Sequence, residues 1–189
     1  MQLKIFLFSK ILLMLISYQL FFIPSVKSAE NIKIVYSLFS RTISVNELKI
    51  FSNEGKLTNE LKRIFKATGS SNKEIQSILN KEFEIPITIA SKLIDSEIGN
   101  VFLTRLSSII HPPNAKDENT GTLALKSSLI QGLNLGDEKI NLINFFEGYP
   151  TKTVILNVNT LSKVMSKVES ISDLLDFFTN SPIEKIKTD

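Results

Sequence analysis

The sequence predicts a mainly α-helical fold with a small β-sheet. Apolar residues recur at helical spacing, with capping motifs between them, through most of residues 44–133. Two β-prone segments flank this region, at residues 31–45 and 153–158. A single strand cannot satisfy its own backbone hydrogen bonds. We therefore expect the late strand to pair with the early segment, so that a small sheet joins the two ends of one domain spanning residues 30–180.

The early β-prone segment is typical of a hairpin. Its first half has one apolar face at a period of two residues, formed by Ile32, Ile34, Tyr36 and Leu38. We expect a bend near residues 39–41, after which Ile43 and Val45 continue the second strand.

The first helix is predicted from Ser44 and Glu47, which have the spacing of a capping box, and it is expected to end near Gly55. Two amphipathic helical faces follow. Their apolar residues are Leu57, Leu61, Ile64 and Phe65 in the first, and Ile75, Ile78, Leu79 and Phe83 in the second.

Pro86 is expected to start a short helix that carries Ile89, Ala90, Leu93 and Ile94. The next helix has a longer stripe, formed by Ile98, Phe102, Leu106, Ile109 and Ile110. Gly99 would let a neighbour approach closely, and Pro112 and Pro113 would end the helix.

Residues 114–121 are polar and turn-forming, which predicts an exposed loop. Residues 122–133 and 143–146 resume helical patterns, and Gly148 and Pro150 end the second of them. Beyond the late strand, residues 161–168 and 171–178 repeat a helical spacing, and residues 181–189 form a polar tail.

Residues 1–29 are typical of a secretory signal peptide. They contain no acidic residue, and Lys4 and Lys10 precede an apolar run that Pro24 and small residues end. Cleavage is expected after Ser28 or Ala29. The alternative is an uncleaved membrane anchor, which Lys10 within the apolar span disfavours.

Removal of this segment would change the charge balance. The full chain has 22 basic and 19 acidic residues, and three of the basic residues lie in the leader, so the mature chain would be neutral. Nucleic-acid binding is therefore not expected. The chain has no cysteine, which excludes disulfides, thiolate catalysis and cysteine-bound zinc.

The ordered segments "AENIKIVYSLFSRTISVNELK", "IGNVFLTRL" and "GLNLGDEKINLINFFEGYPT" resemble a helical domain of unknown function from cyanobacterial exported proteins. In that family the domain usually lies between a signal peptide and a C-terminal α/β-hydrolase domain, and its members are often labelled "alpha/beta hydrolase". The resemblance covers nearly all of residues 29–180.

The sequence departs from a complete α/β hydrolase. The nucleophile elbow G-x-S-x-G, which such an enzyme requires before its acid and histidine, does not occur in this chain. No catalytic residue is therefore transferred from the resemblance. A truncated remnant of a longer hydrolase remains an alternative at this point.

His111 is the only histidine and the one side chain suited to acid–base work near neutral pH. Its place beside two prolines predicts a helix end, where it would bond the last carbonyl groups. A catalytic role is the alternative. One histidine excludes a histidine-cluster metal site, and no loop has the spacing of a calcium site.

The residues Ser70 to Lys73 match the S-x-x-K motif of penicillin-recognising enzymes, but its companion motifs are missing. Ser71 and Glu74 form a capping box in the same place, so we interpret the segment as the start of a surface helix.

Three other groups of residues are candidates for a site. Asp137 and Glu138 are expected to be favourable charges at a helix N-terminus, rather than glycosidase carboxylates. The pairs Phe145-Phe146 and Phe177-Phe178 are expected in the core, the alternative being a pocket for an apolar ligand. Tyr149 and Pro150 are expected in a rigid turn.

The sequence therefore predicts an exported, non-enzymatic module with no catalytic, cofactor or metal residue. Its expected location is the periplasm or thylakoid lumen, with membrane contact only through an uncleaved leader. The expected partner is an α/β hydrolase or another envelope protein. The alternatives are an ester or lipid hydrolase and an apolar-ligand carrier.

Overall fold

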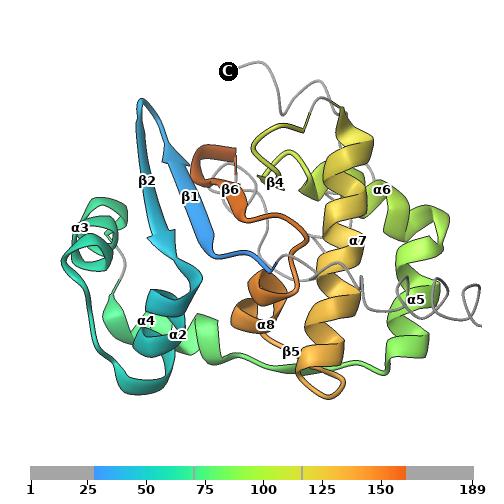
Figure 1. Cartoon of the computed structure of the whole chain (residues 1–189), viewed down its shortest axis with the longest axis horizontal. Helices are drawn as coiled ribbons and strands as arrows, with labels where there is room; N and C mark the ends of the chain where they lie inside the picture. Colours follow the sequence, from blue (N-terminus) through green and yellow to red (C-terminus); the bar gives the residue numbers. More distant parts are fainter. Residues whose placement is uncertain (1–27, 70, 116, 161–189) are drawn as a thin grey trace, which may run out of the picture.

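The computed structural model describes residues 28–69, 71–115 and 117–160. Its helices are α2 (Val45–Glu54), α3 (Asn59–Thr68), α4 (Asn72–Asn80), α5 (Ile87–Asp95), α6 (Glu97–Leu106), α7 (Glu118–Leu135) and α8 (Leu142–Glu147). Its strands are β1 (Asn31–Tyr36), β2 (Phe39–Ser44), β3 (Phe83–Glu84), β4 (Ile110–His111), β5 (Lys139–Ile140) and β6 (Thr153–Asn157). The prediction of a mainly helical fold with a small sheet is confirmed (Figure 1).

The main sheet has the strand order β2-β1-β6-β4. The hairpin of β1 and β2 is antiparallel, and the late strand β6 pairs in parallel with β1. The expected pairing of the two chain ends is therefore confirmed. β4, which the sequence analysis assigned to a helix, adds an antiparallel edge strand on β6.

The hairpin bend lies earlier than expected. Its two turn residues are Ser37 and Leu38, rather than residues 39–41, and Ser37 adopts a left-handed φ of 53°. Phe39 and Arg41 are instead strand residues in register with β1. The sequence gives little sign of this turn because it has no glycine, asparagine or proline.

The capping box that starts α2 is confirmed. The Ser44 hydroxyl accepts from the Asn46 N–H, and the Glu47 carboxylate accepts from the Ser44 N–H at 3.0 Å. Gly55 ends the helix in a left-handed conformation, with φ 69°. Side chains from α4 satisfy carbonyl groups near this end, since Gln76 Nε2 donates to Ser52 O at 2.9 Å and Asn80 Nδ2 donates to the same oxygen at 3.1 Å.

Two predicted helices are shorter in the structure. α4 ends at Asn80, so Phe83 lies in strand β3 opposite Ile140 and not on the helical face. α6 ends at Leu106, so Ile109 and Ile110 lie beyond it. The Ser107 and Ser108 hydroxyls bond the carbonyls of the last turn, and Ile110 gains strand pairing with Leu156.

The predicted loop at residues 114–121 is also shorter, because α7 already begins at Glu118. Asp117 caps this helix by accepting from the Thr120 N–H at 2.7 Å. Acidic and hydroxyl-bearing residues are common at helix starts as well as in loops. The sequence therefore does not show where the loop ends and α7 begins.

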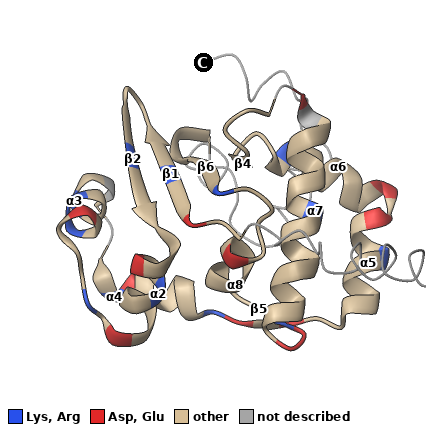
Figure 2. Cartoon of the chain, in the orientation of Figure 1, with Lys and Arg blue, Asp and Glu red and all other residues tan. Residues whose placement is uncertain are grey.

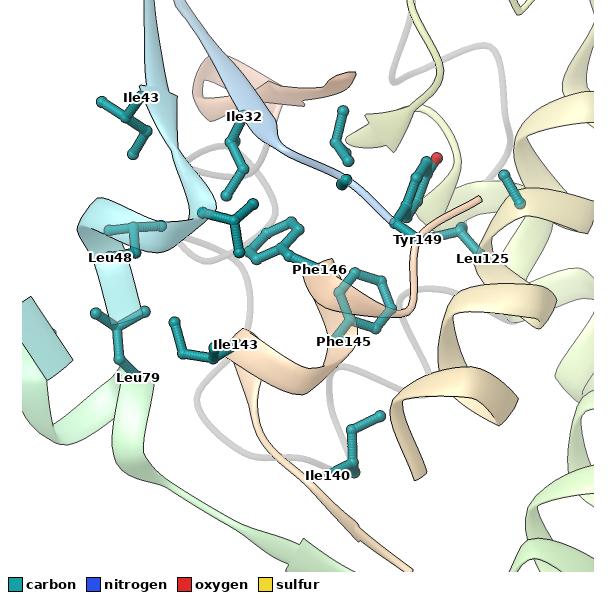
Figure 3. Packing of buried hydrophobic residues seen from close by; sticks show 14 of the residues in the cluster. Ile32, Ile43, Leu48, Leu79, Leu125, Ile140, Ile143, Phe145, Phe146 and Tyr149 are labelled. Atoms are coloured by element: carbon teal, nitrogen blue, oxygen red, sulfur yellow. The ribbon is translucent and has the colours of Figure 1, made fainter. Parts of the chain in front are cut away.

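α7 packs closely on α8. A Cβ atom at Gly148 would lie 2.6 Å from Gly132 N and 2.8 Å from Ser128 O, so this approach requires glycine. The buried Ser128 hydroxyl donates to the Phe145 carbonyl across the same contact. The hydrophobic core lies beside this contact and includes side chains from the sheet, α2, α4, α7 and α8 (Figure 3).

No helix in the described residues is long and apolar enough to cross a bilayer. The predicted leader up to residue 27, the helical patterns after residue 160 and the polar tail lie outside the described residues.

Candidate functional site

The structure separates the residues that the sequence singled out for chemistry. His111 lies in β4 opposite Ile155, and its Nδ1 is 2.9 Å from the Pro112 carbonyl oxygen. The prediction that His111 ends a helix is wrong, because α6 already ends at Leu106 and His111 pairs with β6. The imidazole ring of His111 nevertheless contacts a backbone carbonyl, that of Pro112.

The S-x-x-K motif is divided between the described and undescribed residues. Ser70 lies outside the described residues, and Lys73 is exposed on the first turn of α4. Ser71 caps this helix by accepting from the Glu74 N–H at 3.2 Å. The prediction that a helix starts here with Ser71 as its cap is confirmed.

Asp137 and Glu138 do not start the helix that follows them. Both have left-handed backbone conformations, with φ 54° and 63°, in the tight turn between α7 and β5. Glu138 instead reaches a different helix, since its Oε1 accepts from the Ile87 N–H of α5 at 3.0 Å. The Pro86 cap supplies no side-chain acceptor there, so a distant carboxylate performs that role.

The aromatic residues of α8 belong to the core. Phe145 and Phe146 are buried and pack edge to face, with ring centroids 5.4 Å apart, and Phe145 also contacts the Tyr149 ring (Figure 3). Tyr149 is fully buried, and its hydroxyl has no hydrogen-bond partner among the described residues. Burial raises the pKa of this phenol above its usual value.

Within the described ranges, no group of three or more histidine or acidic side chains is placed to hold a metal ion. Phe177 and Phe178 lie outside those ranges.

One group of exposed large apolar side chains lies on α5 and α6, and we call it the α5–α6 corner. It consists of Ile89, Leu93 and Ile98, whose side chains are 58%, 59% and 63% exposed. Helical spacing predicts all three as members of the apolar sets of these helices. In α5 the residues that face the core are instead Ala90 and Ile94.

The junction between α5 and α6 is closely packed and hydrogen-bonded. A Cβ atom at Gly99 would lie 1.9 Å from the Leu93 carbonyl oxygen, which confirms the expected close approach. The Ser96 hydroxyl accepts from the Gly99 N–H at 3.1 Å and donates to Leu93 O at 2.6 Å. Lys126 of α7 pairs with Asp95 at 3.2 Å and ties the junction to the longest described helix.

Comparison with protein families gives a match to the family described as "Alpha/beta hydrolase of unknown function (DUF1400)" over residues 28–157. The chain belongs to this family. The match ends at Asn157, the last residue of β6, so the DUF1400 match includes the whole main sheet and the α5–α6 corner. No curated protein and no solved structure gives a significant match to the chain.

The DUF1400 match confirms the resemblance in its general form, a domain of unknown function with an α/β-hydrolase label. The matched region has a mainly helical fold whose four-stranded sheet is mixed.

Proposed function

We propose that this chain is an exported, non-enzymatic module that acts by binding another protein, and that its partner is an α/β-hydrolase domain. The observation that carries the proposal is the α5–α6 corner. Three large apolar side chains lie in solvent on a junction held by Gly99, Ser96 and the Lys126–Asp95 ion pair. A rigid apolar surface can bind a partner without first paying to order its own backbone.

The choice of partner rests on the α/β-hydrolase label of the family and on the resemblance, which implies that domains of this kind usually precede an α/β-hydrolase domain. Such a domain would offer an apolar surface to Leu93 and its neighbours.

A photo-crosslinking amino acid at Leu93 tests the partner, with the same group at the exposed Arg63 of α3 as the control. We expect the Leu93 probe, and not the Arg63 probe, to form an adduct with a polypeptide that mass spectrometry identifies as containing an α/β-hydrolase domain. Adducts that are equal at both positions, or that contain no such domain, would contradict the proposal.

Export is supported by residues 1–29, whose order of charges and apolar residues is that of a signal peptide. The expected compartment is the periplasm or the thylakoid lumen. Ala29 is buried in the core, so cleavage after Ser28 would retain a core residue that cleavage after Ala29 would remove. N-terminal sequencing of the protein from an envelope fraction tests both export and the cleavage position.

A second candidate, an ester or lipid hydrolase, is favoured by the α/β-hydrolase label itself. Purified protein assayed on short-chain and long-chain acyl esters separates the two candidates. Turnover that copurifies with the chain through successive columns would replace the binding proposal with an enzymatic one.

A further inference from the structure

The tip of the β1–β2 hairpin carries large apolar side chains in solvent. Tyr36 is 44% exposed, Phe39 70% and Leu38 96%. Tyr36 and Phe39 are paired across the two strands, so their side chains lie on the same face of the hairpin, and Leu38 lies in the turn between them. Figure 1 shows this tip extending away from the helices that pack against the base of the hairpin.

The hairpin is also basic. Residues 31–46 contain Lys33 and Arg41 but no acidic residue, and in Figure 2 the hairpin carries only positive colour above its base. Arg41 is two residues along β2 from Phe39 and therefore points to the same face. It forms no ion pair with any described residue.

The tip is supported by an ordered base. Ile32 and Ile43, which are opposite each other, are both buried, and β1 is paired along its other edge with β6. The apolar end is thus presented on a fixed hairpin and not on a long loop.

We propose that this hairpin tip is a peripheral membrane-binding element that inserts Leu38 and Phe39 into the interface of an anionic lipid bilayer. Arg41 would then lie among the lipid phosphates, and Tyr36 at the level of the headgroups, where aromatic rings with a polar end are favoured. Small apolar insertions combined with basic side chains are the usual means of reversible membrane binding. The site is separate from the leader and from the α5–α6 corner.

A lipid surface fits this shape better than a protein does. Leu38 projects from a convex two-residue turn, and a flat protein surface would cover only one side of it. A bilayer interface deforms around such a tip and removes water from all sides of the side chain. The positive charge of Arg41 also complements an anionic bilayer.

The chain contains no tryptophan, so a single Phe39→Trp substitution reports on the tip alone. The test adds vesicles of phosphatidylcholine and phosphatidylglycerol to the full chain and records tryptophan emission, with and without a lipid that carries a nitroxide quencher. Ile98→Trp, at the α5–α6 corner, is the matched control because Ile98 is similarly exposed. Both variants have the same leader, so tethering through the leader affects them equally.

We expect the emission of Phe39→Trp to shift to shorter wavelength and to be quenched by the nitroxide lipid, while Ile98→Trp changes little. In the Phe39→Trp background, Leu38→Ser should lower vesicle partitioning about tenfold. Arg41→Gln should lower it about fivefold on anionic vesicles and little on pure phosphatidylcholine.

Three outcomes would overturn the proposal. The first is an unchanged Phe39→Trp emission when vesicles are added. The second is an equal response of the two tryptophans. The third is a Phe39→Trp emission that is already at short wavelength in buffer, because the tip would then be covered by another segment of the chain or by a second copy.

Discussion

Ile32 and Val154 lie opposite each other in the parallel pair of β1 and β6, and both side chains are almost completely buried. One residue comes from the first described strand and the other from the last. Helices α2 to α8 all lie between them in the sequence. Their contact therefore closes the fold, and local structure alone would not bring them together.

The first prediction concerns this pair. Ile32→Ala is expected to lower the free energy of unfolding by about 3 kcal/mol and Val154→Ala by about 2 kcal/mol, because each leaves a cavity in the core. The double variant should lose less than the sum, since the two side chains share one contact. Urea denaturation measures all three, with Leu123→Ala on the exposed side of α7 as a control that changes little. Strictly additive losses would show that the two side chains are not energetically coupled.

The second prediction concerns the contact between α7 and α8. Gly148→Ala would place a methyl group 2.6 Å from the Gly132 nitrogen, and neither backbone can move without separating the helices. We expect a loss of about 3 kcal/mol in the free energy of unfolding. Gly69→Ala is the matched control, because Gly69 has a φ of 69° and nothing within 4 Å of the added atom. Only backbone strain of about 1 kcal/mol is expected there.

Thermal unfolding followed by circular dichroism compares the two glycine variants. A Gly148→Ala protein as stable as Gly69→Ala would mean that α7 and α8 do not approach as closely as the structure shows.

The third prediction concerns Glu138, which caps a helix far from it in the sequence. Glu138→Ala removes the acceptor for the Ile87 N–H and should lower stability by about 1 kcal/mol. Glu138→Gln keeps an oxygen at the same position and should retain most of the stability. Hydrogen exchange of the first turn of α5 provides a local measurement. Faster exchange is expected at the Ile87 amide in Glu138→Ala and not in Glu138→Gln.

The sequence predicts those elements whose signals are local. For example, α2 starts at the capping box of Ser44 and Glu47 and ends at Gly55. Both signals depend on residues within one or two turns, and the structure has them where expected. The two-residue strands at Phe83 and Ile110 depend on partners far along the chain, Ile140 and Leu156. No local pattern contains that information, and the apolar spacing at both places is also compatible with a longer helix.

The same reason explains the α5–α6 corner. Ile89, Ala90, Leu93 and Ile94 cover a wide arc of α5, so their spacing predicts a helix without showing which pair is buried. The position of α6 and α7 decides this, and it leaves Ala90 and Ile94 inside and Ile89 and Leu93 in solvent. Leu38 continues the apolar alternation of β1 in the sequence, which predicts a strand residue, whereas in the structure it lies in the turn.

The fourth prediction concerns Tyr149, whose buried hydroxyl lacks a partner among the described residues. Tyr149→Phe removes a polar group that is desolvated without a hydrogen bond, so the variant is expected to be about 1 kcal/mol more stable at neutral pH. A loss of stability instead would show that the hydroxyl has a partner, such as an ordered water molecule.

The dependence of stability on pH gives an independent check of the same residue. Burial raises the pKa of Tyr149 in the folded chain above its value of about 10 in the unfolded chain. Below pH 10 the phenol is neutral in both states and contributes no pH dependence. Above pH 10 the unfolded state releases the proton and the folded state retains it, so stability falls by up to about 1.4 kcal/mol per pH unit.

Urea denaturation at pH 9, 10 and 11 should show a steeper alkaline loss of stability in the wild-type chain than in Tyr149→Phe. Lysine titration affects both proteins and cancels in the comparison, and Tyr36→Phe at the exposed hairpin tip should retain the full alkaline loss. Equal slopes for the wild type and Tyr149→Phe would mean that water reaches the phenol.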